Sequence, residues 1–265
     1  MPDTIKFNKI IVLLLVTAFA LLMFGCGSKQ EASSETGTHL NIAIQPVPGY
    51  VPLYVLRDKG WLTDALKEDA VDINFTEFES GPPENKSFAA GQQDIGVMGN
   101  VPSISGIAAG QNRSIIGISY NGEQATALTQ GQVDAVTTWE PSITKIQSSG
   151  DTQILADGTD LFKGENTIVA DASYVKEYPQ IVKTFLEQYE KAAKEVEEHP
   201  KEIAKTYAKQ FGVSEEEFVS ALSHVEFPIA ITEDDVADLQ KTANFLYESG
   251  TISQQLQIKD SVVKP

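Results

Sequence analysis

Three short polar turns carry residue types that could bind a small ligand. They cover residues 45–50 (QPVPGY), 80–83 (SGPP) and 99–103 (GNVPS). Each turn separates a stretch that predicts a strand from one that predicts a helix. Free N–H groups and a positive partial charge at helix N-termini favour anions, and Gly81 and Gly99 allow a ligand to approach the backbone closely. The turns therefore predict a cradle for an anionic or polar group, although ordinary helix capping gives the same pattern.

The order of the expected elements brings these turns together. Strands are expected over residues 39–45, 72–78, 94–98 and 114–120, and helices over 51–59, 82–90 and 101–109. This alternation predicts an α/β fold with a mainly parallel sheet and helices on both faces. Ligands of such sheets bind beyond the carboxyl ends of the strands, where all three turns would lie. Ser80 and Asn100 could cap a helix there or bind a ligand, and the turns contain no Lys or Arg.

The second half of the chain becomes mainly helical. Short strands are expected at residues 133–138, 152–156 and 167–170, and helices over 178–199, 201–211, 214–223 and 233–249. Ser214 with Glu217, and Thr232 with Asp235, have the spacing of helix-capping pairs.

The N-terminus has the features of an export signal. Lys6 and Lys9 precede an apolar run over residues 10–24, which is typical of a signal peptide and short for a membrane-spanning helix. Gly25-Cys26-Gly27 follows and resembles a bacterial lipobox, in which the cysteine is acylated after cleavage. We therefore expect a signal peptide over residues 1–25, lipidation of Cys26 and a flexible tether over residues 26–38.

Composition narrows the range of partners. The chain has 265 residues, a net charge of −17 and one cysteine. The acidic balance argues against nucleic acid as a partner, because phosphate binding needs a basic surface. The three histidines are isolated in the sequence, so no metal site or cofactor is predicted, and the motifs of hydrolases and nucleotide-binding enzymes are missing from the sequence.

Two stretches resemble a known family. They are FESGPPENKSFAAGQQDIGVMGNVPSISGIAAGQNRSIIGISYN over residues 78–121 and QGQVDAVTTWEP over residues 130–141. Both are similar to the solute-binding proteins of ABC importers for aliphatic sulfonates, taurine and nitrate. The resemblance implies a two-lobed clamshell of the type II periplasmic-binding-protein fold, which binds a small anionic solute between its lobes and delivers it to a membrane permease with its ATPase.

The resemblance also implies where the solute binds. The first lobe would contribute Gln45, Tyr50, Ser80, Gly81 and Asn100, and the second lobe Trp139 and Glu140. Trp139 could pack on an alkyl part of the solute or serve as a core or hinge residue. Glu140 could accept a hydrogen bond from an ammonium group, cap a helix or face water. The expected divisions are a first lobe over residues 39–119, a second lobe over 120–200 and a helical tail over 201–265 that returns to the first lobe.

The second lobe is expected to be incomplete. The stretch ending at residue 122 continues directly into one that lies well inside the second lobe of family members, so at least one βαβ unit of ~30 residues is missing. We therefore expect weak or absent solute binding, with a compact second lobe that binds normally as the alternative. The alternative functions are capture of a thiamine-pyrimidine precursor and an enzymatic activity on the same scaffold. The expected protein is an exported monomer, held by its lipid on the outer face of the cytoplasmic membrane or in the periplasm.

Overall fold

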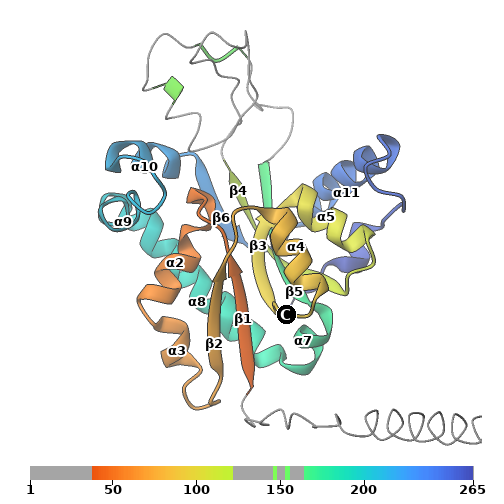
Figure 1. The fold of residues 1–265 in the computed structure, drawn as a ribbon, viewed down its shortest axis with the longest axis horizontal. Helices are drawn as coiled ribbons and strands as arrows, with labels where there is room; N and C mark the ends of the chain where they lie inside the picture. The colour runs from red at the N-terminus through yellow and green to blue at the C-terminus, as the bar shows by residue number, and fades with distance from the viewer. Residues whose placement is uncertain (1–37, 122–145, 148–152, 156–163, 265) are drawn as a thin grey trace, which may run out of the picture. The chain divides into compact units, whose positions relative to one another are not determined.

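A mixed six-stranded sheet organises the part of the chain that the computed structural model describes, which is residues 38–121, 146–147, 153–155 and 164–264. Its strands follow the order β2-β1-β3-β5-β4-β6 (Figure 1). In chain order they are β1 (His39–Ile44), β2 (Asp72–Glu77), β3 (Ile95–Gly99), β4 (Arg113–Asn121), β5 (Gly164–Asp171) and β6 (Val225–Ile229).

Helices connect and cover these strands. The first half contains η1 (Pro48–Tyr50), α2 (Val51–Asp58), α3 (Trp61–Ala65), α4 (Gly81–Ala89) and α5 (Asn100–Ala108). The second half contains α7 (Ala172–Glu177), α8 (Pro179–Glu198), α9 (Pro200–Tyr207), α10 (Glu215–Leu222), α11 (Glu233–Glu248) and η2 (Ile258–Ser261). The expected βαβα alternation up to residue 120 is therefore present. Within the described residues, no helix has both the length and the apolar character needed to cross a membrane.

The direction of two strands corrects the prediction of a mainly parallel sheet. β1, β2 and β3 pair in parallel, but β5 lies between β3 and β4 and runs antiparallel to both. The cause is the path of the chain: β4 ends at Asn121, and β5 begins at Gly164 directly opposite it in the ladder. The chain thus re-enters the sheet from the edge at which it left. β6, which was not predicted, pairs antiparallel with β4 at the end of the sheet.

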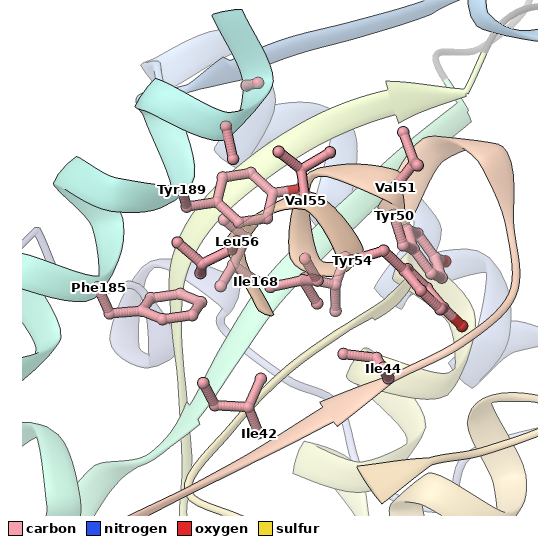
Figure 2. Close-up of a cluster of buried hydrophobic side chains, with 14 of the residues drawn as sticks. Ile42, Ile44, Tyr50, Val51, Tyr54, Val55, Leu56, Ile168, Phe185 and Tyr189 are labelled. Carbon is pink, nitrogen blue, oxygen red and sulfur yellow. The ribbon is translucent and has the colours of Figure 1, made fainter. Parts of the chain in front are cut away.

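Alternating side chains divide the core between the two faces of the sheet. On β1, Ile42 and Ile44 point to the face covered by α2 and α8, whereas Ala43 points to the face covered by α4, α5 and α11 (Figure 1). Figure 2 shows the first of these clusters, in which Phe185 and Tyr189 of α8 pack over the aliphatic side chains of the sheet. Residues 164–198 therefore contribute to the same core as β1 to β3.

Local sequence explains where several helices begin. Ser214 and Thr232 form capping boxes with Glu217 and Asp235, as predicted. α4 and α5 begin differently. Ser80 precedes α4 but its side chain makes no capping hydrogen bond, and Asn100 is the first residue of α5 rather than its cap. The capping role suggested for Ser80 and Asn100 was therefore wrong.

Candidate functional site

The carboxyl ends of β1, β2 and β3 lie side by side because these strands are parallel neighbours. Gln45 after β1, Ser80 before α4 and Asn100 at the start of α5 consequently reach one edge of the sheet, the upper edge in Figure 1. β5 runs in the opposite direction, so Glu165 and Asn166 near its start lie at the same edge. We call this edge, with these five residues, the carboxyl edge. The predicted meeting of the three turns is confirmed by this strand order.

Gln45 is held in the interior of the fold by its amide group. The side chain is only 5% exposed. Its Nε2 donates to Oε2 of Glu84 at 2.6 Å and to the backbone carbonyl of Val97 at 3.3 Å. These two bonds use both hydrogens of the amide and leave Oε1 as its remaining polar atom.

Tyr50 and Asn100 are tied to the start of β5. The Tyr50 hydroxyl donates to Oδ1 of Asn166 at 3.0 Å, and Nδ2 of Asn100 donates to Oε2 of Glu165 at 2.7 Å. Burial, with the Glu84 carboxyl as a second cause, raises the pKa of Tyr50, so its hydroxyl keeps its proton. The first-lobe residues expected at the site are thus brought together, and β5 positions two of them.

Gly81 has a packing role that was not predicted. A Cβ at this position would lie 2.6 Å from both Cβ and Cγ of Pro102, which belongs to α5. Glycine is therefore required so that the first turns of α4 and α5 can touch. The expectation that Gly81 provides backbone access for a ligand gains no support from this contact. The neighbouring Ser80 is exposed and extended at φ −169°, a conformation open to any residue.

Glu84 is a fully buried carboxyl beside the carboxyl edge. It lies in the first turn of α4 above Gly96 of β3, where a Cβ would overlap its Oε1. Oε1 has no hydrogen-bond partner. Burial raises the pKa of Glu84 to about 8, although the Gln45 amide and, more distantly, Arg113 act in the opposite direction. The side chain is therefore largely protonated at neutral pH.

Glu84→Gln should flatten the dependence of stability on pH. The folded-state pKa of about 8 lies above the ordinary value of 4.5, so between these values the folded chain holds a proton that the unfolded chain releases. The contribution of Glu84 to stability is therefore largest at low pH and falls as the pH rises between about 4.5 and 8, by at most about 1.4 kcal/mol per pH unit for one proton. Urea unfolding at pH 5, 6.5 and 8 should show this fall in the parent and a smaller one in Glu84→Gln. The variant Glu202→Gln, at an exposed position, should behave like the parent. An equal dependence of stability on pH in all three proteins would contradict the raised pKa of Glu84.

Glu84, Glu165 and Asn166 were not identified from the sequence. A glutamate in the first turn of a helix is an ordinary feature, so nothing marked Glu84 as buried. Glu165 and Asn166 precede the apolar segment 168–170, and polar residues at the start of a strand that reaches a ligand-binding edge are the one local signal that could have pointed to them. Trp139, Glu140 and Cys26 lie outside the described residues.

The sequence and the structure both resemble known binding proteins. Residues 106–203 match the NMT1/THI5-like family. A protein of Bacillus subtilis (strain 168) described as an aliphatic sulfonates-binding protein is 26% identical over 317 residues, which covers 94% of this chain and 93% of that protein. The aligned length exceeds the 265 residues of this chain, so the relative contains segments with no counterpart here. The resemblance predicted from residues 78–121 and 130–141 is confirmed.

Solved structures identify the fold. The periplasmic aliphatic sulphonate binding protein SsuA from Escherichia coli superposes with a TM-score of 0.76 at 18% identity, over 86% of this chain and 92% of SsuA. The desulfurization enzyme DszB superposes with a TM-score of 0.64 at 12% identity, over 86% of this chain and 96% of the enzyme. The described strands and helices thus form a periplasmic-binding-protein fold, as predicted.

Proposed function

We propose that this chain, which carries an NMT1/THI5-like domain on a periplasmic-binding-protein fold, captures a small anionic solute outside the cytoplasm and delivers it to an ABC importer. The solute would be of the aliphatic sulfonate, taurine or nitrate type. The importer's permease and ATPase subunits would be its protein partners, and the chain would act as a monomer.

One observation carries the proposal: the N-termini of α4 and α5 meet at the carboxyl edge beside Gln45, Tyr50 and Asn100. Open α/β sheets bind ligands at this edge, and helix N-termini favour negative charge. The description of the Bacillus subtilis relative as a sulfonates-binding protein supports the same class of solute. DszB has the same fold and is an enzyme, but a shared fold alone does not carry an activity.

A ligand screen by thermal unfolding tests this proposal on the protein from residue 26 onward. Alkanesulfonates, taurine, nitrate and bicarbonate should raise the unfolding temperature increasingly with concentration, because a ligand of the folded state stabilises by RT ln(1 + [L]/Kd). A shift with hydroxymethylpyrimidines alone would favour the thiamine-precursor function instead. Chemical turnover of a bound solute would favour an enzyme.

We further propose that the second lobe ends before residue 164, earlier than the predicted residue 200. The sheet includes β5, and α7 and α8 pack on it and in the core described above. Residues 164–198 would therefore belong to the first lobe. The extra length of the Bacillus subtilis relative supports a missing segment. In this short second lobe, Trp139 and Glu140 would face the solute. The missing segment would remove part of one wall of the binding cleft, so binding would be weaker than in relatives with a full second lobe.

Cys26→Ala should release the protein from the membrane. We propose that Cys26 carries the lipid because an apolar run and Gly25-Cys26-Gly27 follow the pattern of a lipobox. Fractionation with a metabolically incorporated fatty acid should show the parent labelled in the membrane fraction. The variant should be unlabelled, and either soluble or retained as an uncleaved precursor. A variant that is labelled and cleaved like the parent would contradict the proposal.

A further inference from the structure

The carboxyl group of Glu84 lies next to the proposed solute site. Its Oε2 accepts a hydrogen bond from the Gln45 amide at 2.6 Å, and Gln45 directly follows β1 at the carboxyl edge. Its Oε1 lies over Gly96 of β3, where an added Cβ would overlap it. Glu84 also belongs to the first turn of α4, the helix whose N-terminus would attract the acidic group of the solute. The carboxyl group is therefore enclosed between the start of α4 and the strands β1 and β3.

An ionised Glu84 would have little around it to neutralise its charge. The side chain is fully buried, Oε1 has no hydrogen-bond partner, and Oε2 is bonded to a neutral amide. The cation that acts on Glu84 is Arg113 at the start of β4. The guanidinium group of Arg113 donates to Oδ1 of Asn85 at 2.6 Å and to Oε1 of Gln111, so its hydrogen bonds serve other side chains.

The other elements packed around Glu84 add no charge. Neither β3 nor α5 contains a charged residue, and Lys86, the basic residue of α4, is exposed. Tyr50 of η1 interacts electrostatically with Glu84, but burial raises the pKa of Tyr50, so its hydroxyl stays neutral. A negative charge that binds at the carboxyl edge would therefore be a large change in the electrostatic surroundings of Glu84.

We propose that binding of the acidic solute is coupled to protonation of Glu84. The solute anion and an ionised Glu84 would compete for the positive end of α4, and two like charges repel strongly where burial weakens the screening by water. The solute therefore binds most tightly when Glu84 carries its proton, and by reciprocity the bound solute holds that proton more tightly. The inference rests on the proposed function and adds regulation of the same site by pH.

The affinity should be highest at low pH. In the free protein, burial raises the pKa of Glu84 to about 8. Below this pH the carboxyl group is already neutral, so the solute binds with its full affinity. Above it, Glu84 has to regain a proton each time the solute binds, so the affinity falls as the pH rises, by at most about tenfold per pH unit for one proton.

Ethanesulfonate and nitrate are suitable probes because neither changes its charge between about pH 6 and 9. In calorimetric titrations of the protein from residue 26 onward, the affinity should be at least about threefold lower at pH 9 than at pH 6. This is most of a coupling of about fivefold, the lower end of the usual range. Equal affinities at the two pH values would overturn the inference and leave the proposed function intact. Failure of both anions to bind would overturn the inference, and failure of every solute in the screen would overturn the proposed function as well.

Glu84→Gln assigns the pH dependence of binding to this carboxyl group. The amide has nearly the same shape, can still accept from Gln45 and is neutral at both pH values, so the ratio of the affinities at pH 6 and 9 should fall below about 1.5. The control Glu79→Gln removes the same charge from an exposed position two residues before α4 and should keep the ratio of the parent. A ratio in Glu84→Gln equal to that of the parent, or an equal reduction in the control, would overturn the role of Glu84.

Proton uptake tests the same coupling on the parent protein alone. Titrations with ethanesulfonate at about pH 8, in two buffers with different heats of ionisation, give the number of protons that are bound together with the solute. We expect a net uptake, because the bound anion raises the proton affinity of Glu84. Binding without proton uptake would overturn the inference even if Glu84→Gln failed to fold.

Discussion

Gly81→Val should destabilise the protein and abolish solute binding together. The new Cβ would lie 2.6 Å from two carbon atoms of Pro102, so the first turn of α4 has to move away from α5. Overpacking of this kind costs about 1–3 kcal/mol. The same movement would separate the two helix N-termini that the proposed site depends on, so binding should be lost even where the protein remains folded. Urea unfolding measures the first effect and ligand titration the second.

Ser80→Val is the matched control for this substitution. Ser80 is the preceding residue, is exposed and has an extended backbone that accepts a β-branched side chain. The free energy of unfolding should change by less than about 0.5 kcal/mol. If Gly81→Val were as stable as Ser80→Val, the close contact between α4 and α5 would not exist in solution.

Phe185→Ala should cause the largest loss of stability, about 3–5 kcal/mol. The ring is fully buried in α8, lies 6.1 Å from the ring of Tyr189 and packs in the cluster that joins α2 and α8 to the sheet (Figure 2). Removing the ring leaves a cavity in this core. Urea unfolding of the parent and the variant measures the difference.

Leu186→Ala provides the comparison from the next position of α8. Leu186 is only partly buried, so its truncation should cost less than half as much as that of Phe185. Equal losses would show that the helix as a whole, and not the core cluster, determines stability. A loss below about 1 kcal/mol for Phe185→Ala would place the stabilising core elsewhere in the chain.

Many of the strands and helices could be predicted because their signals are local. The alternation in residues 39–45, the proline-led helix starts and the capping pairs at Ser214 and Thr232 are each contained in a few neighbouring residues. The place of β5 between β3 and β4 could not be predicted in this way. The place of β5 depends on where the chain re-enters the sheet after residue 163, and the sequence of residues 164–171 does not indicate which strands will be its neighbours.

The same distinction applies to the proposed site. The turns at residues 45–50, 80–83 and 99–103 could be assigned to one edge from the order of strands and helices. The hydrogen bonds of the site could not be predicted, because they join side chains that are distant in sequence. Asn100 and Glu165 are 65 positions apart, and Tyr50 and Asn166 are 116 apart. Only the folded arrangement shows that these side chains are hydrogen-bonded to each other.

We propose above that a small acidic solute binds at the carboxyl edge of the sheet. The most direct measurement is an NMR titration of the isotope-labelled protein, from residue 26 onward, with taurine as the ligand. We expect amide shifts to change first and most at Gly81, Asn100, Glu165 and Asn166, with weaker effects beyond the starts of α4, α5 and β5. Saturable changes confined to another part of the molecule, or none with taurine or any acid of the screen at millimolar concentration, would contradict it.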